Sequence, residues 1–455
     1  MQIPPYIKVV TFSDYVVLHN LKSGGWVKIT REYYEQLASY LSTNELSEFK
    51  SQLDDFDEFV EYLIRNEYLY NEETVCCGDE PGPGIRHGDI KLVYLHLCDA
   101  CNLRCRTCYF SPSDSPTYLS TEVAKRTVRL LAMGGTKAVV LSGGEPLLHP
   151  DVEQVARSAK EAGMNVGIIT NGTLLDRDIA ARLMGYVDYI QISIDGLQDQ
   201  HDRIRGPGSY RAALTGARRA REAGMQNVIL TTTVTRLNVD SWRDIRENTH
   251  NMGFSQSFSL FMPTGVGKIN AHELMPSPEQ LLPFVLGLLT CDDGKELPEP
   301  ISLISRCSCG AGVHLISIDP DGSIYPCHLI RAPELKMGSV VTTEHSLLED
   351  ISKSRVFKRL RSCNVDSNRK CSLCQVRYFC AGGCSANGIL NGLDVDPHCT
   401  WYKPLYSAAI ECMDKSRKGA EILALMKEYL KSERWKRDER SRDVACLQEV
   451  QNPRC

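Results

Sequence analysis

The residues with the clearest chemical potential are cysteines, of which the 455-residue chain has 19. Cys101, Cys105 and Cys108 lie close together in the segment CNLRCRTC, directly after an apolar run. Three thiolates on one short loop can surround a cubane iron–sulfur cluster, and a four-iron cluster held by three cysteines keeps one iron without a protein ligand. That iron is open to a cofactor or a substrate. A zinc site is the alternative interpretation.

A second motif follows the next apolar run and consists of Gly143, Gly144, Glu145 and Pro146. Two glycines allow a backbone to approach a ligand closely. A carboxylate accepts hydrogen bonds from an ammonium group. The segment therefore predicts a ligand-binding turn, and a plain turn is the alternative.

More cysteines occupy residues 301–405, where turns are frequent and no periodic apolar core is evident. Cys309 precedes Gly322 by twelve intervening residues, and Cys327 follows after four more. The spacing C-x2-C-x5-C-x3-C and a final cysteine come next, formed by Cys371, Cys374, Cys380, Cys384 and Cys399. In a chain without an evident secretion signal, such cysteines favour metal binding over disulfides. We therefore expect something other than apolar packing to hold this region together.

The segment CNLRCRTC resembles the three-cysteine signature of the radical S-adenosylmethionine superfamily. The resemblance implies that these cysteines hold a 4Fe-4S cluster whose open iron chelates the amino and carboxylate groups of the cofactor's methionine. An electron from the cluster then cleaves the sulfonium and yields a 5′-deoxyadenosyl radical. The resemblance also implies these cofactor contacts: the backbone of Tyr109 with adenine, Gly143, Gly144, Glu145 and Pro146 with the amino group, and Ser193 and Arg205 with the carboxylate.

The later cysteines resemble the seven-cysteine SPASM domain, which is attached to many radical enzymes that modify peptides. The resemblance implies two auxiliary 4Fe-4S clusters, and so three clusters in total. The implied ligand sets are Cys371, Cys374, Cys380 and Cys399 for one cluster, and Cys309, Cys327 and Cys384 for the other.

A fourth ligand for the three-cysteine auxiliary cluster is left open by the sequence. Cys307 and Cys363 are the candidates, and an open iron that binds a substrate thiolate is the alternative. The remaining cysteines belong to no motif and are interpreted as structural: Cys76, Cys77, Cys98, Cys291, Cys412, Cys446 and Cys455.

The elements that must position the first two motifs alternate between strands and helices. Strands are predicted at residues 91–97, 138–141, 166–170, 189–194, 228–234 and 254–261, with helices at 120–133, 150–163, 175–186, 208–223, 239–252 and 277–290. This alternation predicts an α/β fold with a parallel sheet, a partial (β/α)6 TIM-type barrel. Both motifs fall at the carboxyl ends of strands, where sites in such sheets lie.

The N-terminal residues 1–75 are expected to form an independent unit. Strands at 7–12, 15–19 and 26–29 are followed by two helices, an order typical of a winged-helix-like domain. The Gly- and Pro-rich residues 76–90 predict a linker. We divide the chain into a recognition domain with its linker at 1–85, a radical S-adenosylmethionine domain at 86–300, an auxiliary-cluster domain at 301–415 and a solvated helical tail at 416–455.

Composition narrows the classes of partner. A net charge of -5 and a pI near 6.2 disfavour nucleic acid and anionic membranes as partners. The N-terminus has no pattern of a secretion signal, and the most apolar later run is too short to cross a bilayer. We expect a cytoplasmic protein.

These resemblances together predict a maturase for a ribosomally made precursor peptide, recognised through its leader. The reaction would be thioether formation between a cysteine sulfur and a carbon, with a flavodoxin or ferredoxin as electron donor. A carbon–carbon crosslink is the close alternative. Formylglycine formation and a non-enzymatic iron–sulfur scaffold or electron carrier are further alternatives. The sequence identifies no catalytic acid or base.

Overall fold

The computed structural model describes residues 1–42, 53, 55–70, 88–288, 303–343, 346–414, 417 and 419–432. Within these ranges the fold centres on a nine-stranded sheet of order β12-β11-β10-β4-β5-β6-β7-β8-β9. Its parallel strands in chain order are β4 (Leu92–Cys98), β5 (Ala138–Gly143), β6 (Asn165–Thr170), β7 (Tyr189–Ser193), β8 (Val228–Val234) and β9 (Ser255–Leu260). The predicted α/β fold with a parallel sheet is confirmed.

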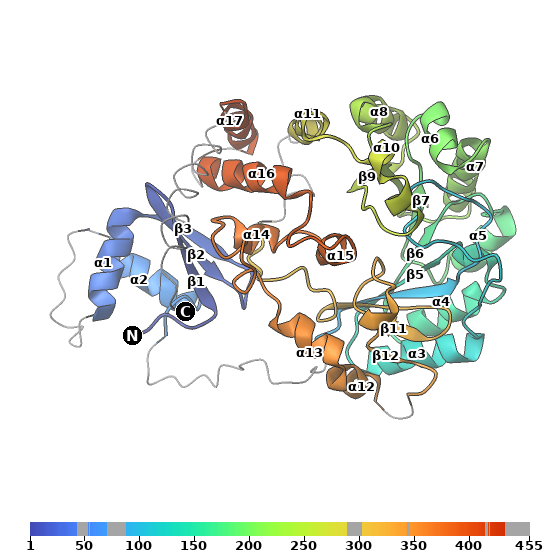
Figure 1. Cartoon of the computed structure of the whole chain (residues 1–455), viewed down its shortest axis with the longest axis horizontal. Helices are drawn as coiled ribbons and strands as arrows, with labels where there is room; N and C mark the ends of the chain where they lie inside the picture. The colour runs from blue at the N-terminus through green and yellow to red at the C-terminus, as the bar shows by residue number, and fades with distance from the viewer. Residues whose placement is uncertain are drawn as a thin grey trace.

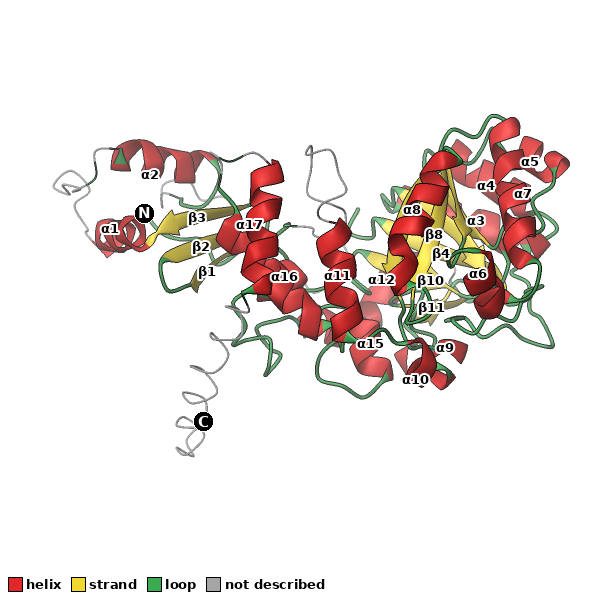
Figure 2. Ribbon diagram, turned by 90° about the horizontal axis from the view of Figure 1, so that it is seen from above, coloured by secondary structure: helices red, strands yellow, loops and turns green. Residues whose placement is uncertain are grey.

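Helices cover the outer face of this sheet (Figure 2). They include α3 (Thr121–Met133), α4 (Val152–Glu161), α5 (Arg177–Leu183), α7 (Ser209–Glu222) and α8 (Trp242–Asn251), all of which the sequence predicts. Helix α6 (Gln198–Arg205) was not predicted, and the short α9 (Val266–Ile269) and α10 (Ala271–Leu274) precede the predicted α11 (Pro278–Leu288). Short 3-10 turns lie at Pro146–Leu148, Val239–Ser241 and Pro333–Leu335.

The two faces of each strand carry different chemistry. On β4 the fully buried Val93, Leu95 and Leu97 belong to the main apolar core under the helices. Successive side chains of a strand point to opposite faces, so Tyr94 and His96 lie on the inner face of the sheet. The same alternation runs along β5, β7 and β8. The inner face is therefore where polar side chains gather.

The cysteine-rich region extends the same sheet. Strand β10 (Leu315–Ile318) pairs in parallel with β4, and β11 (Ser323–Tyr325) and β12 (Gly338–Ser339) continue it antiparallel. Helices follow at α12 (Leu347–Lys353), α13 (Arg355–Ser362), α14 (Arg377–Cys380), α15 (Ser385–Leu390), α16 (Cys399–Cys412) and α17 (Gly419–Lys431).

The N-terminal unit is a three-stranded antiparallel sheet with two helices. The strands β1 (Ile7–Thr11), β2 (Tyr15–Asn20) and β3 (Trp26–Thr30) lie in that order, and α1 (Arg31–Ser42) and α2 (Phe56–Arg65) follow. Leu37, Phe56 and Leu63 pack on one face of the sheet in a core of its own. Most of the predicted linker lies outside the described residues.

The other face of the N-terminal sheet packs on the cysteine-rich region. Phe12, Tyr15 and Val17 share an apolar core with Phe379 and Trp401. Figure 1 shows α14, α15 and α16 between the N-terminal sheet and the large sheet. The expectation that residues 1–75 are independent is therefore not met, and neither is the expectation that residues 301–405 lack an apolar core.

The tail also differs from its prediction in part. Ile422, Leu423, Met426 and Leu430 of α17 are buried in that same core, so this helix is packed rather than solvated. Among the described residues, no helix is long and apolar enough to cross a membrane.

Candidate functional site

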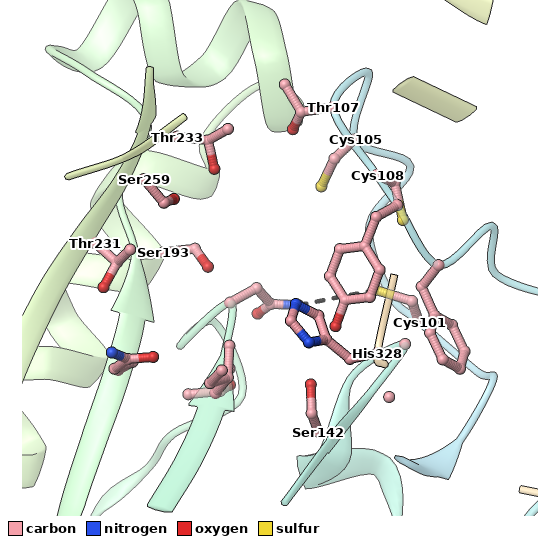
Figure 3. A pocket seen from close by; sticks show the side chains of 18 of the residues that line it. Cys101, Cys105, Thr107, Cys108, Ser142, Ser193, Thr231, Thr233, Ser259 and His328 are labelled. Atoms are coloured by element: carbon pink, nitrogen blue, oxygen red, sulfur yellow. Dashed lines mark hydrogen bonds between the residues drawn. The ribbon is translucent and has the colours of Figure 1, made fainter. Parts of the chain in front are cut away.

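The first cysteine loop follows β4 and faces the carboxyl ends of the strands across a cavity of about 480 Å³. Figure 3 shows Cys101, Cys105 and Cys108 on one side of this cavity. The loop is fixed at its middle and end, because Arg106 N donates to Ile204 O at 2.9 Å and Gly267 N donates to Cys108 O at 3.0 Å. The sequence-predicted cysteines are thus brought together on an ordered loop.

The thiols of this loop are partly buried. Burial raises the pKa of Cys101 to about 12, and burial also raises the pKa of Cys105 although Arg205 opposes it. A thiol with such a pKa keeps its proton at neutral pH until a metal displaces it. Three partly buried thiols that face one cavity fit the ligand set of an iron–sulfur cluster.

The two glycines of the second motif are required by packing. A Cβ at Gly143 would lie 2.3 Å from the carbonyl oxygen of Cys98, and one at Gly144 would lie 2.2 Å from that of Ala100. Gly143 also has φ +139°, which favours glycine. Both residues line the cavity, so the end of β5 touches the segment that leads into the cysteine loop.

Glu145 and Pro146 are not among the residues that line the cavity. The Glu145 carboxylate accepts hydrogen bonds from Thr170 Oγ1 at 2.6 Å, Asn171 N at 2.8 Å and Leu147 N at 3.1 Å. Burial raises the pKa of this carboxyl group, and the three donors counteract the shift. In this structure Glu145 joins the ends of β5 and β6.

Asn171 extends this connection to the cysteine loop. Its Nδ2 donates to Asn102 Oδ1 at 2.8 Å, beside Cys101. Thr170 and Asn171 both line the cavity. The carboxylate of Glu145 therefore positions the loop through the end of β6.

Arg205 lies at the end of α6 and reaches into the cavity. Its Nε donates to Asp195 Oδ2 at 2.7 Å, and its Nη1 lies 3.9 Å from Cys105 Sγ. Burial alone would lower the pKa of Arg205, but Asp195 and the cysteines hold it above its ordinary value. A guanidinium fixed in this way suits a carboxylate ligand.

Hydroxyl groups form the wall opposite the cysteines, and the sequence analysis found only Ser193 among them. Thr231 and Thr233 of β8 and Ser259 of β9 lie beside it (Figure 3). Thr231 Oγ1 is buried and has no hydrogen-bond partner among the described residues. Such an orphaned hydroxyl fits a cavity that takes a polar ligand. The run Thr231-Thr232-Thr233, in a strand that ends at this face, was the available signal.

Aromatic rings close a third side. Tyr109 lines the cavity, and its ring lies 5.5 Å from that of His328, which stacks on Tyr94 at 4.1 Å. Burial lowers the pKa of His328 to about 3, so the ring is neutral at physiological pH. The sequence analysis missed His328, although its position directly after Cys327 was a signal.

The later cysteines form two groups. Cys309, Cys327 and Cys384 gather in one apolar cluster, and burial raises the pKa of Cys327 to about 12, with smaller contributions from the other two thiols. Burial likewise raises the pKa of Cys380 to about 12, with contributions from the remaining motif cysteines, Cys374, Cys399 and Cys371. These groupings coincide with the two ligand sets that the sequence predicts.

Asp396 orders the loops of both groups. Its carboxylate accepts hydrogen bonds from Cys384 N at 2.7 Å and His398 N at 2.9 Å. The first amide is that of the motif cysteine Cys384, and the second is that of the residue directly before the motif cysteine Cys399. The two groups are thus held by one buried carboxylate.

The candidate fourth ligands, Cys307 and Cys363, line one cavity together with Cys309, Cys371 and Cys384. Cys307 packs in the apolar core of Cys371 and Cys374, whereas Cys363 is exposed. No three or more His, Cys, Asp or Glu side chains in the described ranges have the geometry to hold a single metal ion.

Comparisons with known proteins agree with the two cysteine constellations. Residues 95–248 match the Radical SAM superfamily, and residues 309–375 match an iron–sulfur cluster-binding domain named SPASM.

Relatives by sequence have more than one activity. The mycofactocin maturase MftC of Mycolicibacterium smegmatis is 29% identical over 327 residues, which cover 68% of this chain and 82% of the relative. The AdoMet-dependent heme synthase of Methanosarcina barkeri is 29% identical over 350 residues, which cover 69% of this chain and 97% of the relative.

Two solved structures share the fold. Native anSMEcpe with bound AdoMet and the Kp18Cys peptide has a TM-score of 0.57 at 17% identity, covering 71% of this chain and 97% of that chain. Streptococcus suis SuiB bound to its precursor peptide SuiA has a TM-score of 0.53 at 15% identity, covering 87% and 98%.

Proposed function

We propose that this chain, a radical S-adenosylmethionine enzyme that carries a SPASM domain, matures a ribosomally made precursor peptide by forming a thioether crosslink. The observation that carries the proposal is one cavity lined by the three loop cysteines, the two motif glycines, Ser193 and Arg205. Support for a peptide substrate comes from MftC, named a maturase, and from anSMEcpe and SuiB, both solved with a peptide.

In this proposal each side chain has a task. Cys101, Cys105 and Cys108 hold the catalytic cluster, and Arg205 and Ser193 bind the methionine carboxylate. The backbone of Gly143 and Gly144 holds the amino group, while Glu145 and Pro146 support that turn. Tyr109 packs beside the adenine. Bound S-adenosylmethionine supplies a 5′-deoxyadenosyl radical, which takes a hydrogen atom from a carbon of the peptide.

The auxiliary cysteines hold two more 4Fe-4S clusters in this proposal, for three in total. Formation of the carbon–sulfur bond releases the thiol proton and one electron, and an auxiliary cluster provides a place for that electron. A flavodoxin or ferredoxin supplies the electron that starts the reaction.

The N-terminal unit is proposed to be a winged-helix-like module that binds the leader as an added strand. In such binding, backbone hydrogen bonds at a free sheet edge give affinity and side-chain pockets give selectivity. Strands β1 and β3 are the edges of the described three-stranded sheet.

A heme-forming activity is the second candidate, because the match to the heme synthase covers 97% of that relative. The cavity argues against it. Among the described lining residues, Arg205 is the cationic side chain, and in this proposal it already binds the methionine carboxylate of the cofactor. A tetrapyrrole bearing several carboxylates would need more buried positive charge.

The test is anaerobic reconstitution with S-adenosylmethionine, a reductant and a candidate cysteine-containing precursor peptide, chosen from the open reading frames that neighbour this gene. The expected product has lost two hydrogens for each crosslink and no longer reacts with a thiol-alkylating reagent. Loss of two hydrogens with the thiol still reactive would indicate a carbon–carbon bond. An aldehyde that reacts with hydroxylamine would indicate formylglycine. No change in the peptide, together with turnover of a porphyrin, would reject the proposal.

A further inference from the structure

The loop that carries Cys327 also forms part of the catalytic cavity. His328 and Leu329 line that cavity, although Cys327 belongs to an auxiliary group. The His328 ring stacks on Tyr94 of β4 and meets Tyr109 edge-on. One segment, residues 327–331, thus contacts both cysteine constellations.

Arg331, at the end of this segment, holds the catalytic loop. Its Nη1 donates a hydrogen bond to the carbonyl oxygen of Phe110, two residues after Cys108. Its guanidinium lies 3.6 Å from the centroid of the Phe110 ring, which is buried. An arginine that bonds the backbone and stacks on the ring of the same residue fixes that residue in position and orientation.

Asp319 anchors the arginine. Its Oδ2 accepts a hydrogen bond from Arg331 Nε at 2.7 Å, and its Oδ1 pairs with Nδ1 of the fully buried His96 at 2.9 Å. The His96 ring also meets the Phe110 ring edge-on at 4.7 Å. Asp319 directly follows β10 and His96 lies on β4, so the network spans both strands and the cysteine loop.

We propose that Arg331, anchored by Asp319, is a positioning residue for the catalytic cysteine loop and couples the Cys327 segment to the S-adenosylmethionine site. Asp319 is buried and Arg331 is partly buried, with Phe110 under the guanidinium and His96 on the carboxylate, so the geometry of these hydrogen bonds determines where Phe110 lies. A shift of residues 327–331 moves Tyr109 and Phe110 with it. The inference rests on the proposed function, because it assigns the cavity to that cofactor.

The experiment measures cofactor binding and leaves peptide chemistry aside. The full-length, reconstituted enzyme is titrated with S-adenosylmethionine by calorimetry, and the electron paramagnetic resonance of its reduced catalytic cluster is recorded before and after addition. Arg331→Lys keeps the charge but loses the planar fork, and Asp319→Asn keeps the shape but loses the charge. Each is expected to bind the cofactor about tenfold more weakly, with a smaller spectral change and unchanged auxiliary iron.

Arg126→Lys is the matched control. Arg126 of α3 also donates to a carbonyl of the cysteine-rich region, that of Val340, but it touches neither cysteine loop. Its variant is expected to match the wild type in affinity and spectrum. Wild-type affinity and spectrum in both Arg331→Lys and Asp319→Asn would overturn the inference.

Other outcomes are also decisive. Selective loss of the catalytic cluster in both variants would support the inference, because the loop would then no longer be held. Unfolding of both variants at the assay temperature would assign the network to general stability and overturn it. Failure of the wild-type enzyme to bind S-adenosylmethionine would instead reject the proposed function.

Discussion

The two cysteine constellations are built in different ways. Cys101, Cys105 and Cys108 follow a strand whose other face belongs to a large apolar core contributed by its own sheet and helices. One group of auxiliary cysteines lies among short elements whose apolar partners come from far away in the chain. Cys371 and Cys374 share a core with Val17 of the N-terminal sheet and Phe284 of α11.

This difference explains where each site is vulnerable. The catalytic loop depends on local contacts, such as the fit of Gly144 against Ala100. The auxiliary region depends on contacts between regions, such as His19 with Ser305 and Trp26 with Phe379. We therefore expect distant substitutions to disturb the auxiliary clusters and local ones to disturb the catalytic cluster.

The largest effect is expected from removing the catalytic ligands. Cys101→Ala, Cys105→Ala and Cys108→Ala together should abolish reductive cleavage of S-adenosylmethionine, because no thiolate remains for the catalytic cluster. Iron should fall from about twelve to about eight atoms per chain, since each 4Fe-4S cluster carries four. Cys412→Ala, at a buried thiol that belongs to no motif, is the control for cleavage. Continued formation of 5′-deoxyadenosine by the triple variant would refute the assignment.

The next prediction compares a substitution in the shared core with one in the N-terminal unit's own core. Phe379 is fully buried against Trp26 and His19, and Leu37 is fully buried within the N-terminal core. Truncating either to Ala should lower the free energy of unfolding by about 3–4 kcal/mol. Only Phe379→Ala should also release auxiliary iron, because Phe379 directly precedes Cys380. Denaturant unfolding and iron analysis check both.

Equal iron content in the Phe379 and Leu37 variants would show that the shared core does not support the auxiliary cluster.

Deletion of residues 1–75 is a second test of whether the shared core supports the auxiliary cluster. That deletion would expose the apolar face around Phe379, so it is expected to reduce auxiliary iron as well as leader recognition. An intact set of three clusters in the truncated enzyme would restore the interpretation of an independent unit.

The sequence predicted the catalytic region more fully than the auxiliary one. Alternation of apolar residues and the position of a motif are enough to predict a site when its strand, helix and loop are neighbours in the chain. For this reason β4 and its cysteine loop were predicted from the sequence. The core around Phe379 could not be found in this way, because its partners Val17 and Phe284 lie hundreds of residues apart. The contact of His328 with the cavity and that of Arg331 with Phe110 likewise require the pairing of β10 with β4, which no local pattern reveals.

The fit of Gly144 gives a smaller, local effect. In Gly144→Ala the new Cβ would overlap the carbonyl oxygen of Ala100, so the segment before the cysteine loop must move. We expect a loss of about 2–3 kcal/mol in stability and weaker retention of catalytic iron. Gly185→Ala is the control, since a Cβ there meets nothing within 4 Å. Thermal unfolding and iron retention in both variants test the contrast, and equal behaviour would show that the close contact is unimportant.

The smallest effect concerns how the free energy of unfolding depends on pH. It arises at the junction between the N-terminal sheet and the auxiliary region. His19 is fully buried, its Nδ1 pairs with Ser305 Oγ at 2.8 Å, and its ring packs on Tyr378 and Phe379. Burial, with a smaller contribution from Arg377, lowers the pKa of His19 to about 3. The unfolded chain, whose histidines titrate near pH 6.5, therefore binds more protons than the folded protein between about pH 3 and 6.5.

Because the unfolded state binds more protons in this window, the contribution of a neutral His19 to stability is complete above about pH 6.5 and declines as the pH falls toward 3. His19→Gln removes this titration while keeping a polar side chain that can reach Ser305. The variant should lose less stability than the wild type between pH 7 and pH 5, by about 2 kcal/mol, when denaturant unfolding is measured at both values. His201→Gln is the control inside the large sheet domain, because burial lowers the pKa of His201 to about 4 but its ring meets Tyr210 of α7. His201→Gln should weaken the pH dependence of the free energy of unfolding to a similar extent. It should leave the loss of auxiliary iron at acid pH unchanged, whereas His19→Gln should reduce that loss. If both variants release auxiliary iron at acid pH as the wild type does, the junction is not what makes the auxiliary region acid-sensitive.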